Sequence, residues 1–169
     1  MSDNVNLAAF NALPSEMAEA ALLACCASPR WVRRMAQRRP FEDAAELFAA
    51  ADAIWWELAP ENWLEAFAAH PKIGEKPQQE SGQARAWSEQ EQAAAHSDAT
   101  TRAALEQANQ AYQERFGYIF IVCASGKTAG EMLAILRGRL QNDADAELRV
   151  AAEEQRKITE LRLQKLLGL

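Results

Sequence analysis

Prolines divide the first half of the chain into short segments whose apolar residues follow a helical spacing. The 169 residues include six prolines and only seven glycines, whereas alanine is frequent. Alanine favours helix, and proline is tolerated only in the first turn of a helix or beyond its end. The segment 15–27 shows the i, i+3, i+4, i+7 spacing of one helix face, at Met17, Ala20, Ala21 and Ala24. The pattern predicts an all-α protein of short helices.

We expect a single domain over residues 1–169, because this length suits one domain that buries a sizeable core. The expected architecture is a bundle of about seven to eight short helices. The expected helices cover 15–27, 31–39, 41–58, 60–70, a segment from 87, 98–115, 128–141 and 144–167. Residues 72–86 contain proline and glycine and are interpreted as a loop. Residues 118–123 (YIFIVC) have no evident partner strand, so we expect one buried extended segment there.

The charge balance argues against a nucleic-acid partner. Eighteen basic and 24 acidic residues give a net charge of −6, whereas phosphate binding needs a basic face. The five arginines within 30–39 fall on several sides of a short helix and are interpreted as a solvated, partly paired face. No apolar run is long enough for a membrane span, and residues 1–6 lack a signal pattern, so we expect a cytoplasmic protein. Cys25, Cys26 and Cys123 are expected to be reduced and mostly buried.

Two histidines are candidates for proton transfer near neutral pH. His70 precedes Pro71 at the expected end of a helix, where the helix dipole favours imidazolium. It is either a catalytic group or a capping histidine on the surface. His96 lies in a polar stretch and is more simply a surface residue. The histidines and cysteines have no metal-ligand spacing, so no metal is expected.

Ser88, Glu91 and Gln92 share one face of an expected helix. Ser88 and Glu91 also fit a capping box, in which the serine begins the helix and the glutamate bonds back to it. A polar binding cluster is the other interpretation. The two are compatible, because a helix start offers free N–H groups to an anionic ligand.

Arg162 lies within the apolar arc of the last helix. At about 100° per residue from Leu148, Arg162 falls near −40°, among the apolar positions, while Lys157 falls near 180°. An arginine that points at a core needs an anion or several acceptors. It either binds a ligand's carboxylate or ureido carbonyl with its planar fork, or forms an internal salt bridge, or extends to solvent.

Several motifs in order resemble the 2-oxo-4-hydroxy-4-carboxy-5-ureidoimidazoline (OHCU) decarboxylase family of urate degradation. These motifs, from about residue 7 to 167, are FNxLP at 10–14, CCxSxxW at 25–31, RPF at 39–41, HPKIG at 70–74, SxxEQ at 88–92, FGYxF at 116–120 and IxxLRL at 158–163. Each motif alone is weak, whereas their order and spacing are specific. One departure is Ile119, where many relatives carry proline.

The resemblance implies an all-α, cofactor-free lyase that converts OHCU to (S)-allantoin and is a homodimer. It implies His70 as the catalytic histidine and Glu91 as its partner. It implies substrate binding by a further set of residues, which are Pro71, Ser88, Gln92, Arg162 and the main chain of Phe120, Ile121, Val122, Cys123 and Ala124. The alternatives are a non-catalytic helical interaction module, which leaves Arg162 unexplained, and a lyase or hydrolase acting on a related ureido acid.

Overall fold

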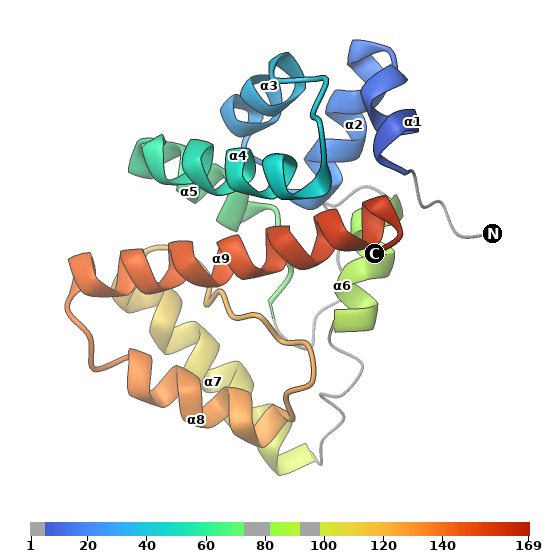
Figure 1. The fold of residues 1–169 in the computed structure, drawn as a ribbon. Helices are drawn as coiled ribbons and strands as arrows, with labels where there is room; N and C mark the ends of the chain where they lie inside the picture. Colours follow the sequence, from blue (N-terminus) through green and yellow to red (C-terminus); the bar gives the residue numbers. More distant parts are fainter. Residues whose placement is uncertain (1–5, 73–81, 92–98) are drawn as a thin grey trace. The chain divides into compact units, whose positions relative to one another are not determined.

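The computed structural model describes residues 6–72, 82–91 and 99–169, and these form nine α-helices (Figure 1). The helices are α1 (Leu7–Ala12), α2 (Ser15–Cys25), α3 (Pro29–Gln37), α4 (Ala44–Glu57), α5 (Pro60–Ala68), α6 (Gly82–Glu91), α7 (Ala99–Phe116), α8 (Ala129–Arg139) and α9 (Ala144–Leu167). The all-α prediction is confirmed. The helix beyond the predicted number is α1, a six-residue helix capped by Asn6 that has too few turns to show a periodic pattern.

The chain folds as two compact units. The first unit comprises residues up to Ala66 together with Arg156–Leu169, and the second comprises Phe67–Gln155. The boundaries fall inside α5 and α9, so each of these helices contributes residues to both units. The prediction of one domain over residues 1–169 stays a prediction.

In the first unit, two of the sequence motifs hold each other. The Arg39 guanidinium donates to the carbonyl oxygens of Phe10 (2.7 Å) and Leu13 (2.8 Å). The Asn11 side chain forms two hydrogen bonds with the main chain of Phe41, of 2.9 and 3.0 Å. The motifs at 10–14 and 39–41 therefore serve the fold. They also explain one member of the arginine cluster, since Arg39 donates to partly buried carbonyl groups of the chain itself.

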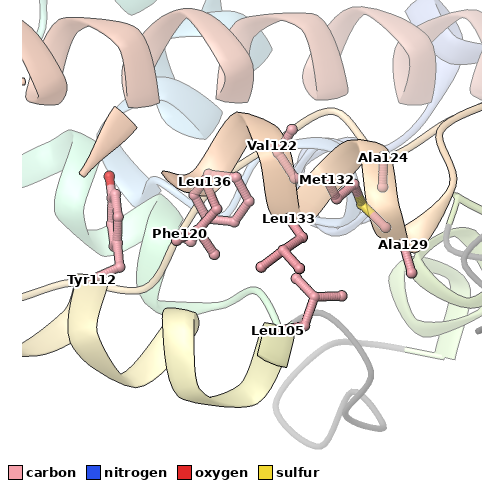
Figure 2. Packing of buried hydrophobic residues seen from close by; sticks show 9 residues of the cluster. All are labelled: Leu105, Tyr112, Phe120, Val122, Ala124, Ala129, Met132, Leu133 and Leu136. Carbon is pink, nitrogen blue, oxygen red and sulfur yellow. The ribbon is translucent and has the colours of Figure 1, made fainter. Parts of the chain in front are cut away.

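The second unit is built on α7 and α8, which pack against the segment that follows α7. Side chains of α7, of α8 and of this segment form one buried cluster, in which Figure 2 shows Leu105 of α7 beside Leu133 of α8. Its other members are Tyr112, Phe120, Val122, Ala124, Ala129, Met132 and Leu136. Of the segment 118–123, predicted to be buried and extended, residues 120–123 are buried and residues 118 and 119 are half-buried, and none lies in a helix or strand. The buried stretch continues to Ala124. Gly117 (φ 85°) and Gly126 (φ 75°) bound it in the left-handed region that glycine adopts without strain.

Two predictions around residue 88 are wrong. Residues 82–86, predicted as loop, are the first half of α6, because Gln83, Ala84 and Arg85 favour helix and no proline interrupts them. Ser88 therefore lies in the second half of a helix and does not begin one. The capping box of Ser88 and Glu91 is excluded, and with it the anion site at a helix start.

The three cysteines, Cys25, Cys26 and Cys123, are free and buried, as predicted. None of the described helices is long and apolar enough to cross a membrane.

Candidate functional site

The candidate residues are distributed over both units. Those of the second unit are His70, Pro71, Ser88, Glu91 and the segment 120–124, whereas Arg162 belongs to the first unit. Gln92 and His96 lie outside the described residues.

His70 lies just beyond α5, which ends at Ala68, and its backbone N–H bonds to the carbonyl of Phe67 at 3.1 Å. Its Nε2 is 2.6 Å from Oε1 of Gln155 in α9. Gln155 is fully buried, and His70 is half-buried. The imidazole is therefore held by a specific partner, which a histidine that merely caps a helix on the surface would not need.

The sequence analysis did not identify Gln155 as a candidate residue, although its position in the helical spacing of the last helix indicates that it is buried. At about 100° per residue from Leu148, Gln155 falls at about −20°. This position is closer to the centre of the apolar arc than that of Arg162. A glutamine at such a position needs a buried partner. His70 is that partner, 85 residues away along the chain.

Ser88 and Glu91 lie on the buried face of α6. The buried positions of this helix are Ala84, Trp87, Ser88 and Glu91, which follow the i, i+3, i+4, i+7 spacing of one face. Ser88 is 2% exposed and Glu91 9% exposed. Two polar side chains on a face that should be apolar are a functional signal, since burying a carboxylate is costly unless it has partners.

Glu91 acts electrostatically on Cys123. Burial raises the pKa of the Cys123 thiol, the Lys127 ammonium lowers it, and the carboxylates of Glu154 and Glu91 raise it. Burial is the largest of these influences on the thiol, and the Glu91 carboxylate is the smallest of those named.

The main chain of the segment 120–124 is held by three charged side chains. Arg139 donates to the carbonyl of Ile121 at 2.5 Å, and the Lys127 ammonium donates to the carbonyl of Cys123 at 2.7 Å. The N–H of Cys123 donates to Oε1 of Glu154 at 3.2 Å. Charged partners bind peptide groups more strongly than neutral ones, so this non-helical backbone is fixed in place.

Arg139 is itself held in a buried network. Its guanidinium bonds to both carboxylate oxygens of Glu147, which is fully buried and also accepts hydrogen bonds from Tyr112 and Asn142. The Arg139 guanidinium lies over the Phe120 ring, 4.6 Å from its centroid. Burial and the bond to Glu147 raise the pKa of Tyr112, which therefore remains a neutral donor. Through the bond from Arg139 to the Ile121 carbonyl, this network holds the segment 120–124 in place.

Arg162 is 3% exposed, so its predicted place in the apolar arc is confirmed, and an arginine extending to solvent is excluded. Lys157, predicted on the opposite side, is exposed. Nη1 of Arg162 donates to the carbonyl of Ala24 at 3.1 Å. Burial raises the pKa of the neighbouring Cys26 thiol to about 11, against a lowering influence of Arg162. The bond to the Ala24 carbonyl fixes the orientation of this buried guanidinium.

A small pocket lies elsewhere in the first unit, between α3, α4 and α9. It is lined by Trp31, Phe48, Ala51, Asp52, Trp55, Arg156, Thr159, Glu160 and Leu163. Arg156 bonds to Glu160 at 2.9 Å and approaches Asp52 at 3.5 Å on its rim. Its lining includes none of the candidate residues, so it is separate from the groups described above.

Comparison with known proteins gives consistent results. The sequence model of the OHCU decarboxylase family matches residues 11–164. The uric acid degradation bifunctional protein TTL of Arabidopsis thaliana is 40% identical over 145 residues, which are 84% of this chain but only 45% of that protein. The OHCU decarboxylase of Haloferax volcanii is 31% identical over 139 residues, 80% of each chain.

A solved structure agrees in fold. The crystal structure of OHCU decarboxylase in the presence of (S)-allantoin superposes with a TM-score of 0.77 and 36% identity, covering 89% of this chain and 99% of that one. The fold and the matches define an all-helical carboxy-lyase of uric acid degradation. The chain belongs to the OHCU decarboxylase family.

Proposed function

We propose that this protein decarboxylates OHCU to (S)-allantoin without a cofactor, and that His70 is the proton carrier. The observation that carries the assignment of His70 is the 2.6 Å contact of its Nε2 with Gln155, which holds a half-buried imidazole in one orientation. Family membership over residues 11–164 supports the reaction.

The substrate supplies its own electron sink. In OHCU one ring carbon bears the carboxylate and the hydroxyl, and the adjacent ring carbon is part of a carbon–nitrogen double bond. When the bond to the carboxylate breaks, CO₂ leaves and the electron pair forms a double bond between the two ring carbons, while the former double bond places its pair on nitrogen. The reaction therefore needs no pyridoxal or thiamine group of the kind other decarboxylases use as a sink.

The residues of the site then handle protons and orientation. His70 accepts the hydroxyl proton, so that this ring carbon becomes a carbonyl, and delivers a proton to the ureido-bearing carbon from one face, which gives a single enantiomer. The ring nitrogen that received the electron pair takes up a proton from solvent, which balances the negative charge left when CO₂ departs. A positioned acid or base of this kind contributes about 10²–10⁴ in rate. Glu91 acts beside His70 on the bound substrate, where its carboxylate accepts hydrogen bonds from the ureido N–H groups and so fixes the reacting carbon for proton transfer.

The other candidates bind the substrate. Arg162 binds its carboxylate or a carbonyl oxygen, because a buried guanidinium suits two-point recognition of such groups. The remaining binding groups are Pro71, Ser88, Gln92 and the main chain of the segment 120–124. The charged side chains that fix that segment support its role, since orientation of the ring determines which face receives the proton.

The test is a chiral assay. Urate, urate oxidase and hydroxyisourate hydrolase generate OHCU, and circular dichroism follows the product. Addition of this protein is expected to accelerate formation of (S)-allantoin over the spontaneous reaction, which gives the racemate. An unchanged rate and no enantiomeric excess would reject the proposal, and acceleration with a different ureido acid alone would redirect it to another lyase or hydrolase.

The resemblance also supports a homodimer in the cytoplasm. Three free, buried cysteines suit a reducing compartment. Light scattering at two protein concentrations tests the dimer, which is expected at twice the chain mass of 18.7 kDa.

A further inference from the structure

Gln155 is placed to control which nitrogen of His70 carries a proton. A side-chain amide oxygen only accepts hydrogen bonds, so a ring nitrogen 2.6 Å from Oε1 must bear hydrogen. Gln155 is fully buried, and a buried amide group keeps its partners because leaving one unmade is costly. The partner on the histidine is Nε2, so the contact with Oε1 favours the Nε2–H tautomer of the neutral imidazole.

We propose that Gln155 is a positioning residue that holds His70 as the Nε2–H tautomer, so that Nδ1 is the nitrogen that exchanges protons with the substrate. The inference rests on the proposed function for the identity of the reaction. The tautomer itself does not depend on it.

The chemistry favours a neutral partner here. A carboxylate bonded to Nε2 would stabilise imidazolium and weaken the acid, whereas an amide orients the ring without adding charge. When Nδ1 takes a proton both nitrogens bear hydrogen, and when Nδ1 gives it up the Nε2–H bond to Gln155 is intact. Each proton transfer therefore returns the ring to the same tautomer and orientation.

A second contact from the same helix indicates that α9 supports the site. Glu154, adjacent to Gln155, accepts the hydrogen bond from the N–H of Cys123 at 3.2 Å. Consecutive residues of one rigid helix thus hold the imidazole and the segment 120–124. Because both contacts lie within the second unit, α9 fixes the distance between proton carrier and binding segment there.

The histidine content makes the tautomer directly measurable. The chain has two histidines, so His96→Gln leaves a single imidazole for long-range ¹H–¹⁵N correlation spectra. Above the pKa of His70 we expect the Nε2–H tautomer, with a slowly exchanging Nε2 proton. An Nδ1–H tautomer would overturn the proposal, because it would make Nε2 an acceptor.

Replacing Gln155 tests the contact. Gln155→Met keeps the side-chain length but removes the acceptor, so the Nε2 proton signal is expected to exchange rapidly. A hydrogen bond of ordinary strength corresponds to a fall in kcat of about tenfold, with KM changed less than about twofold. Gln164→Met, the same change at a half-buried position of α9, is the control and is expected to keep both values.

Gln155→Glu separates positioning from mere packing. A carboxylate still accepts from Nε2 but raises the pKa of His70, so the acidic limb of the rate profile is expected to move to higher pH while the tautomer is kept. An unmoved profile, or a kcat for Gln155→Met equal to that of Gln164→Met, would overturn the proposal.

If Gln155→Met does not fold, Gln155→Asn withdraws the oxygen by one methylene and is expected to lose the Nε2 signal. Absence of decarboxylase activity in the unaltered protein, with the Nε2–H tautomer present, would reject the reaction and not the contact.

Discussion

Arg139 joins two buried partners, Glu147 and the carbonyl of Ile121, with one guanidinium. Its Nε and Nη2 bond to the Glu147 carboxylate at 2.9 and 2.5 Å, and Nη1 bonds to the Ile121 carbonyl. Arg139 is the last residue of α8 and Glu147 lies in the first turn of α9. The ion pair therefore connects the turn between these helices to the segment proposed to bind substrate.

Arg139→Met is expected to lower the free energy of unfolding by about 3–5 kcal/mol, because it leaves the fully buried Glu147 carboxylate without its counter-charge. Urea denaturation measures the loss. Arg137→Met, the same change at an exposed position of α8, is the control and is expected to stay within about 0.5 kcal/mol. The double variant Arg139→Met/Glu147→Leu is expected to regain much of the loss, since an apolar pair leaves no buried charge. Equal losses for Arg137→Met and Arg139→Met would contradict this account.

His70→Ala is expected to reduce kcat by about 10²–10⁴ while leaving the melting temperature close to that of the unaltered protein. The side chain is half-buried and follows the end of α5, so few packing contacts depend on it. His96→Ala, which removes the other histidine, is expected to keep the rate. Retention of most of the activity in His70→Ala would show that another group carries the proton.

Arg162→Ala is expected to raise KM strongly, because the substrate loses a two-point partner. Arg162→Lys keeps the charge without the fork and is expected to recover only part of the affinity. Steady-state kinetics and thermal melting are measured on both variants. An unchanged KM with a large fall in melting temperature would assign Arg162 to an internal structural role through contacts such as the one with the Ala24 carbonyl.

The positions of the helices and of their buried faces could be predicted, because they depend on the local spacing of apolar residues. Helical spacing and proline placement predicted most helices, and the same spacing placed Arg162 inside and Lys157 outside. The errors arose where local signals compete. Ser88 followed by Glu91 looks like a helix start, but the helix-favouring residues before it extend α6 back to Gly82.

The long-range contacts could not be predicted from spacing. The pairing of His70 with Gln155 spans 85 residues, and that of Asn11 with Phe41 spans 30. Each contact joins polar groups that are at least partly buried, two side chains in the first pair and a side chain with the main chain in the second. Many pairs of groups in a sequence could satisfy that condition. The family pattern identified His70 and Glu91 as candidates, whereas only coordinates reveal that Gln155 is bonded to the imidazole.

Cys26 is expected to make stability fall at alkaline pH. Burial raises the pKa of its thiol in the folded protein to about 11, above the ordinary value, so folding favours the protonated form. That contribution is fully present below the pKa of the unfolded chain, near 8.5, and is lost as pH rises toward 11, at about 1.4 kcal/mol per pH unit between the two. Urea denaturation between pH 7 and 10 measures it, with Cys26→Ala as the comparison. The alanine variant has a constant cost from its lost thiol contacts, so the unaltered protein's advantage is expected to shrink as pH rises above about 8.5. Parallel curves over this range would show that the Cys26 thiol titrates alike in the folded and unfolded chain.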